Sequence, residues 1–183
     1  MGKNVKISTE KSVDILDMVS INDIEQRRVK LNKLELLMNS CEQVDVPVKH
    51  RFSGGIYARE IVIPKGTLLV GRIHKFDHFD MMISGDILVS TDTGEHKRLS
   101  GLNIMEGKSG KKRAGYALED THWITFHNVE ERDPEEMYEH ITCGSFEELD
   151  KFNKDLSNAL KQYEEEENIL KEAAKHILEK SEV

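Results

Sequence analysis

The feature that most constrains the fold is a series of short β-rich segments between residues 44 and 129. Apolar or alternating runs recur at intervals of about ten residues, as in IYAREIVI, TLLVGRI, MMISGDILVST and HWITFHNV. Glycine- or proline-containing turns separate them, among them SGG, PKG, TDTG and GKSGKK. Strands at this spacing, with no helical periodicity between them, predict an antiparallel sandwich or barrel. Gly94 in the TDTG turn suits the positive φ that a hairpin requires.

A helical pattern precedes the β-rich region. Residues 1–12 are mostly polar and are predicted to start the chain in a disordered state. Ser20 and Asp23 have the spacing of a capping box, and the apolar residues that follow recur at intervals of three, four or seven. This pattern predicts a helix over residues 21–39.

The region after the strands is acidic and helical. Pro134 suits the first turn of a short helix, and Ser145 begins a second capping box. An apolar stripe then runs to the end of the chain, and it predicts one long helix or two helices joined near the acidic run 164–167. The stripe fits a helix packed on the barrel or on a partner, and it also admits a partial heptad with Glu167 at a core position. We therefore expect three zones: a tail and helix over 1–43, a barrel over 44–130 and an acidic helical extension over 131–183.

Composition excludes several classes of protein. The chain has 183 residues, of which 38% are hydrophobic and 33% charged, and its net charge is −8. An acidic balance argues against a nucleic-acid partner, which a basic excess would favour. Cys41 and Cys143 are isolated, which favours a reduced, cytoplasmic protein. No apolar run approaches the roughly 20 residues of a membrane span, so we expect no membrane partner.

Histidines supply the first candidate site. His74 ends the run TLLVGRIH, and His78 follows across a bend, so both side chains can reach one ion. Neutral imidazole is a good ligand for divalent transition metals. His127 shares one strand face with Trp123, and the sequence leaves open whether that face is inside or outside the barrel. We predict a metal site of His74, His78 and His127, with His50 as a further candidate ligand. The alternative is a ligand-free barrel with hydrogen-bonded or exposed histidines.

A basic, glycine-rich loop supplies the second candidate site. The stretch KSGKKR concentrates four basic residues in an acidic chain, and its glycines let a ligand approach the backbone closely. Such a loop suits a phosphate or a carboxylate, although it lacks the spacing of a Walker A loop. The alternative is a solvated hairpin loop whose lysines protect an edge strand. The residues predicted to bind an anionic metabolite are Arg72, Lys112, Arg113, Tyr116, Tyr57 and Arg59.

The segment PKGTLLVGRIHKFDHFDMMISGDILVSTDTGE resembles the first motif of the cupin (RmlC-like) barrels. With Gly85 as the closing glycine, Arg72 and His74 take the places of the family's His-x-His pair, and His78 takes the place of its Glu. In the second motif Arg113 stands where the family has His, and the usual Pro is absent. The resemblance implies a cupin-type barrel or jelly roll over about residues 48–127 and a pairing of barrels into a homodimer. It departs from the family's usual metal ligands.

The runs VPVKHRFSGGIYAREIVIPKGTLLVGRIHK and GKSGKKRAGYALEDTHWITFHNV, with the acidic helix, resemble small cupin-like proteins of tailed bacteriophages and prophages. This resemblance implies a protein of an infected or lysogenic bacterium. Three functions follow as hypotheses. The first is a barrel pocket that binds a divalent metal or an anionic metabolite, with catalysis left open. The second is an accessory protein that contacts a host protein in host takeover or anti-defence. The third is a structural component of the virion.

Overall fold

The computed structural model describes residues 2–130 and 133–181, with the side chains of residue 135 and of residues 173–181 left undescribed. The chain divides into two compact units, Met1–Phe146 and Glu147–Val183. The first unit holds all the strands, and the second is most of one helix. Among the described residues, no helix combines the length and the apolar character that crossing a membrane requires.

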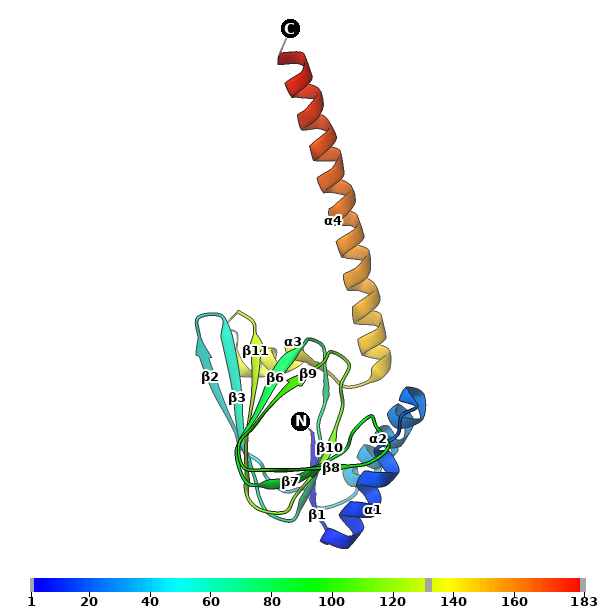
Figure 1. The fold of residues 1–183 in the computed structure, drawn as a ribbon, viewed down its shortest axis with the longest axis vertical. Coiled ribbons are helices and arrows are strands. Elements are labelled where there is room, and N and C mark those ends of the chain that lie inside the picture. The colour runs from blue at the N-terminus through cyan, green and yellow to red at the C-terminus, as the bar shows by residue number, and fades with distance from the viewer. Residues whose placement is uncertain (1, 131–132, 182–183) are drawn as a thin grey trace. The chain divides into compact units, whose positions relative to one another are not determined.

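The first unit is built on two five-stranded antiparallel sheets that face each other (Figure 1). One sheet has the order β1 (Lys3–Lys6), β4 (Thr67–Val70), β10 (Ala114–Ala117), β7 (Asp86–Val89) and β8 (Lys97–Ser100). The other has the order β2 (Val48–Ser53), β3 (Ile56–Ile63), β11 (Thr121–Asn128), β6 (His78–Ser84) and β9 (Asn103–Gly107). A small third sheet pairs β5 (Ile73–His74) with β12 (Thr142–Cys143). Most neighbours in each sheet are distant in sequence, so the predicted cupin-type jelly roll with flanking helices is confirmed.

The barrel interior is apolar at one end and polar at the other. Because β3 and β11 are antiparallel, Ile63 lies opposite Thr121 at one end, and Tyr57 lies opposite His127 at the other. The apolar end is filled by a cluster of buried side chains from both sheets, namely Ile61, Ile63, Met82, Ile87, Val89, Leu99 and Ala117. At the polar end, α3 (Pro134–Ile141) packs Met137 and Ile141 against Tyr57. Helix α3 therefore covers the histidine-bearing end of the barrel (Figure 1).

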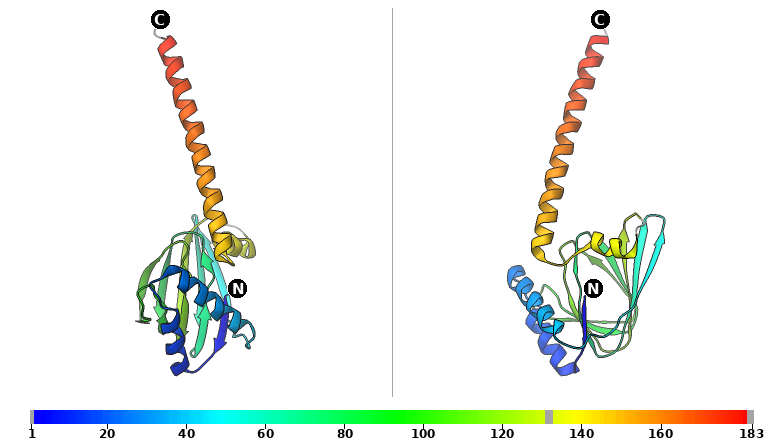
Figure 2. Two further views of the ribbon diagram at one scale, coloured as in Figure 1. Left: turned by 90° about the vertical axis from the view of Figure 1, so that its right-hand side faces the viewer. Right: turned by 180° about the vertical axis from the view of Figure 1, so that it is seen from behind.

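Helices α1 (Thr9–Val19) and α2 (Ile24–Asn39) lie on the outside of the first sheet, as both views in Figure 2 show. Their buried apolar residues form one cluster with side chains of β1, β4, β7 and β10, namely Val5, Leu16, Val19, Leu31, Leu34, Met38, Leu68, Val70, Leu88, Ala114 and Tyr116. The expected disorder of residues 1–12 is wrong for the described residues, because Val5 is buried in this cluster and β1 pairs with β4.

The start of the predicted first helix also differs from expectation. Ser20 ends α1, and the helix over 21–39 begins only at Ile24. Asp23 is the N-cap of α2, and its side chain accepts a hydrogen bond from the Gln26 backbone N–H at 2.9 Å. The predicted N-cap was Ser20, whereas the observed N-cap is Asp23. A carboxylate accepts a hydrogen bond from an unpaired N–H in the first turn as a serine hydroxyl does, so Asp23 can take this role. The predicted helices after the strands are confirmed as α3 and a single α4 (Phe146–Ser181).

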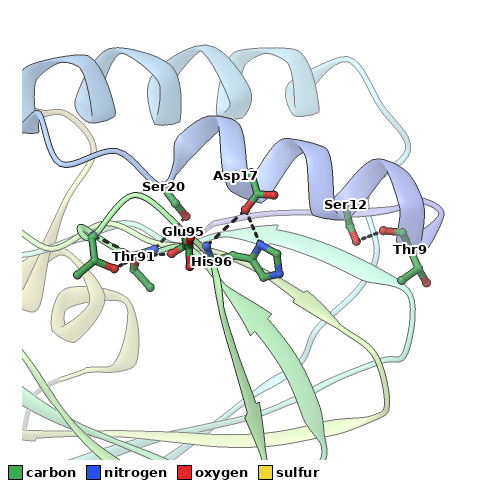
Figure 3. Close-up of polar contacts among 8 residues, drawn as sticks. Thr9, Ser12, Asp17, Ser20, Thr91, Glu95 and His96 are labelled. Carbon is green, nitrogen blue, oxygen red and sulfur yellow. Dashed lines mark hydrogen bonds and ion pairs between the residues drawn. The ribbon is translucent and has the colours of Figure 1, made fainter.

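The loop between β7 and β8 is fastened to α1 by polar contacts (Figure 3). The Thr91 backbone N–H donates to the Ser20 hydroxyl at 3.1 Å, and the His96 Nδ1 lies 2.5 Å from an Asp17 carboxylate oxygen. The hydrogen bond from His96 lowers the pKa of Asp17 below its ordinary value. Gly94, at the tip of the loop, has a φ of 100°, the positive value that the sequence predicted. The hairpin is thereby held against the helical layer.

Candidate metal centre and ligand cavity

Three histidines from three different strands meet at the polar end of the barrel. His74 lies on β5, His78 on β6 and His127 on β11, and each offers a ring nitrogen within 4.8 Å of the other two. The ring centroids are 4.0 Å apart for His74 and His78, 5.3 Å for His74 and His127, and 5.0 Å for His78 and His127. The structure thus brings together the three histidines that the sequence analysis grouped. We call them the histidine cluster.

Strand alternation explains why His127 reaches the cluster. On β11, Thr121, Thr125 and His127 are buried, and the Trp123 indole lines the interior cavity. Residues of opposite parity point to the outer face, where the His122 imidazole lies 3.0 Å from the Glu60 carboxylate. The alternative that the sequence left open is therefore decided: the face with Trp123 is the inner face.

The ring nitrogens of the cluster have the chemistry that a metal requires. Nδ1 of His74 and both nitrogens of His127 are buried and have no hydrogen-bond partner among the described residues. The His78 Nδ1 lies 3.1 Å from the Phe76 carbonyl oxygen, and its Nε2 lies 3.5 Å from the Asp80 carboxylate. In the tautomer with its proton on Nδ1, Nε2 offers a lone pair to a metal. Buried polar atoms without a partner destabilise a fold, and a bound cation would satisfy one nitrogen of each ring. The donor set fits a divalent transition metal.

Burial keeps the imidazoles of His74 and His127 neutral. Burial lowers the pKa of His74 well below its ordinary value, and the charges of His78 and His127 add to this effect. Burial also lowers the pKa of His127 to about 4. Neutral imidazole is the form that binds a metal. Near pH 7, His74 and His127 therefore need not lose a proton before they bind a cation.

Asp80 is a site residue that the sequence analysis missed. It is buried, and its Oδ1 accepts hydrogen bonds from the Trp123 indole at 3.0 Å and from the Thr125 hydroxyl at 2.9 Å. Its Oδ2 lies 3.5 Å from the His78 Nε2 and 3.6 Å from the Arg113 guanidinium. Burial raises the pKa of this carboxyl, but hydrogen bonds and charge from His78 outweigh that effect, and the pKa is about 2. The spacing of His78 and Asp80 was the available signal, because alternate residues of a strand share a face.

A cavity of about 140 Å³ adjoins the cluster inside the barrel. Apolar side chains line one part of it, namely Ile61, Ile63, Leu69, Ile87 and Val89. Polar and charged side chains line the rest, namely Arg59, Arg72, His74, His78, Asp80, Lys111, Arg113, Trp123 and Thr125. A cavity of mixed character next to convergent polar groups is typical of a small-ligand site.

Three of the predicted anion-binding residues line this cavity. The Arg72 guanidinium lies 4.9 Å from the Tyr138 ring centroid, and it donates two hydrogen bonds of 3.1 Å to the Glu139 carboxylate. Arg59 lies at 5.8 Å from the same ring, and its Nε is buried without a hydrogen-bond partner among the described residues. Together with Arg113 they give the cavity a positive wall beside the histidine cluster.

The other three predicted anion-binding residues lie outside this cavity, and the predicted metal ligand His50 lies outside the histidine cluster. Lys112 does not line the cavity, because its Nζ is held by Glu35 at 2.5 Å on α2. Tyr116 packs under the outer helices, where its hydroxyl lies 3.1 Å from that of Thr9. Tyr57 is buried beside the cluster, with its ring 6.4 Å from that of His127, but it is outside the cavity lining. His50 is exposed on β2, and its Nδ1 lies 2.8 Å from the Tyr57 hydroxyl, so it is outside the histidine cluster.

No protein-family model matches the sequence. No curated protein matches it either. Solved structures of cupin type are similar in fold. Ectoine synthase from P. lautus has a TM-score of 0.44 and 14% identity, over 56% of this chain and 77% of that chain. An RmlC-like cupin from Methanocaldococcus jannaschii has a TM-score of 0.40 and 12% identity, over 46% of this chain and 81% of that chain. Acetylacetone dioxygenase from Acinetobacter johnsonii has a TM-score of 0.39 and 10% identity, over 45% of this chain and 59% of that chain.

Proposed function

We propose that the barrel binds a divalent transition metal through His74, His78 and His127, and that the adjoining cavity holds a small anionic ligand beside it. The observation that carries the proposal is the convergence of buried ring nitrogens without hydrogen-bond partners among the described residues. A ligand-free barrel leaves those nitrogens unsatisfied, at a cost in folding free energy that a bound cation removes.

The residues around the histidine cluster have different roles in binding the anionic ligand. A bound metal supplies a Lewis acid that polarises a ligand oxygen. The guanidinium groups of Arg59, Arg72 and Arg113 favour a negatively charged ligand, and the apolar part of the cavity accepts its hydrocarbon part. Asp80 is ionised and holds Trp123 and Thr125 by hydrogen bonds, so it orients these two side chains of the cavity wall beside Arg113.

Metal analysis of the full chain, purified without a histidine tag, tests this proposal. We expect about one metal ion per chain and an increase in melting temperature with Mn, Fe, Ni or Zn. His127→Ala removes one of three ligands and is expected to weaken metal binding at least about 100-fold. His122→Ala is the matched control, because His122 lies on the outer face of the same strand. Absence of metal and of any thermal shift in the wild-type protein would contradict the proposal.

A specific observation favours a second function, self-association through α4. Leu160, Tyr163 and Leu170 continue its apolar stripe at helical spacing and are 58%, 73% and 70% exposed. In a parallel, in-register pair of helices, Glu167 of one copy would face Glu167 of the other, and the two carboxylates would repel each other. An antiparallel second copy, with Leu160 against Tyr163 of that copy, sets the acidic run 164–167 opposite the uncharged residues 156–159. We infer an antiparallel homodimer; the accessory and virion roles implied by the phage resemblance stay predictions.

Light scattering coupled to size-exclusion chromatography measures this association. The wild-type chain is expected to elute at twice its chain mass, and Leu160→Asp at the monomer mass, because a buried carboxylate opposes helix pairing. Gln162→Asp adds the same charge two residues away on the same helix, opposite Lys161 of the second copy in this register, and is expected to leave the dimer intact. A monomeric wild-type chain, or a dimer that survives Leu160→Asp, would count against α4 as the interface.

A further inference from the structure

A second cavity, of about 180 Å³, lies between α2, the loop after β7 and the loop after β9. We call it the basic cleft after the cationic side chains that line it, Arg27, Arg28, Lys108, Lys111, Lys112 and Arg113. Asp92 is the one acidic residue among its lining residues. In a chain of net charge −8, this concentration of positive charge runs against the overall balance.

Four of these cations have a carboxylate partner among the described residues. Lys108 forms an ion pair with Asp77 and Lys112 with Glu35, Arg113 lies near Asp80, and Arg28 lies near Glu25.

By contrast, Arg27 and Lys111 make no ion pair within the part of the chain that the structure describes. The Arg27 guanidinium donates a hydrogen bond to the Ile21 carbonyl oxygen, which holds the side chain in place without neutralising it. The basic cleft therefore has two positive charges, on Arg27 and Lys111, that no carboxylate among the described residues neutralises.

The electrostatics of Lys111 are consistent with this excess. Burial lowers the pKa of its ammonium group below the ordinary value, and the charges of Arg113 and Arg27 lower it further, while those of Asp92 and Asp80 act in the opposite direction. The pKa is lowered on balance, so burial and repulsion between like charges outweigh the two carboxylates. An anion bound between Arg27 and Lys111 relieves that repulsion and gains charge-assisted hydrogen bonds from both.

We propose that the basic cleft binds the phosphate group of a small phosphorylated molecule, with Arg27 and Lys111 as its main charge partners. A phosphate dianion matches two unpaired cations, and the planar Arg27 guanidinium can bind two of its oxygens. The volume is below the 300 Å³ or so at which pockets for drug-sized ligands begin, so it suits a phosphate group and its immediate substituent. The site is separate from the histidine cluster, because no histidine of that cluster lines it.

Isothermal titration of the full chain with inorganic phosphate tests the proposal, with chloride at matched ionic strength as the reference. Phosphate is expected to bind and to raise the melting temperature, whereas chloride is not. Arg27→Gln is expected to weaken phosphate binding about tenfold or more, because it removes a charge-assisted hydrogen bond. Lys33→Gln is the matched control, since Lys33 lies exposed on the same helix and away from the cleft.

Two outcomes overturn the proposal: a wild-type chain that does not bind phosphate, and an Arg27→Gln variant that binds it as tightly as wild type. Arg27→Lys is the second variant in case Arg27→Gln does not fold; it keeps the positive charge but loses the planar pair of donors, and it too is expected to weaken binding. Metal binding by Arg27→Gln is expected to equal that of wild type, because Arg27 is outside the barrel cavity. A failure here therefore leaves the proposed metal centre untouched, and loss of the metal centre leaves phosphate binding intact.

Discussion

Gly107→Ala is expected to lower the free energy of unfolding by about 2–3 kcal/mol and to weaken metal binding. Gly107 pairs with His78 across β9 and β6. A Cβ at this position would lie 2.1 Å from the His78 Nε2 and 2.3 Å from its Cε1. Real side chains do not approach so closely, and His78 is buried, so its ring must leave the position that it holds in the histidine cluster.

Urea unfolding and metal titration measure the two effects of Gly107→Ala. Gly71→Ala is the matched control, because a Cβ at Gly71 meets its nearest neighbour, the Arg113 carbonyl oxygen, at an ordinary 3.9 Å. Neither glycine has a positive φ, so the two substitutions differ in steric contact and not in backbone strain. Equal stability and equal metal affinity in the two variants would show that His78 does not depend on the missing side chain.

Glu35→Gln is expected to destabilise the protein by about 2–3 kcal/mol, because it leaves a buried ammonium group without its counter-charge. The Lys112 side chain is 1% exposed, and its Nζ lies 2.5 Å from the Glu35 carboxylate and 3.2 Å from the Asn32 side-chain oxygen. This contact joins α2 to the loop before β10. Removing a charge from one side of a buried pair costs more than the pair itself contributes.

The reverse substitution is expected to cost less. In Lys112→Met the remaining Glu35 carboxylate is 21% exposed and can be hydrated, so the loss is expected to stay below that of Glu35→Gln. Glu167→Gln is the control for an exposed ion pair, with Lys171 at 2.7 Å, and its effect is expected to be below about 0.5 kcal/mol. Chemical denaturation measures all three. A loss of unfolding free energy for Glu35→Gln no larger than that for Glu167→Gln would contradict a stabilising role of the buried Glu35–Lys112 ion pair.

Lys112 also shows that basic residues adjacent in the sequence need not contribute to the same site. The run KSGKKR predicts an anion-binding loop because its charges are adjacent in the chain, yet they point to different places. Lys112 is buried against Glu35 on α2, whereas Lys111 and Arg113 line both cavities, with Arg113 beside Asp80. Adjacent residues of an extended segment point to opposite sides, so the role of each depends on what packs against that side.

The sequence predicted the fold class and the three residues of the histidine cluster, but it also offered His50, which lies outside the cluster. Alternation at a period of two and regularly spaced turns predict a sheet, and the cupin-like motif includes His74 and His78. Three features depend on packing between distant residues: the Trp123 face is inside, Asp80 joins the site, and residues 3–6 form an edge strand. Both faces of β11 mix apolar and polar residues, so local pattern does not distinguish them. The inner face is the one that the opposite sheet and α3 cover, through contacts between residues far apart in the chain.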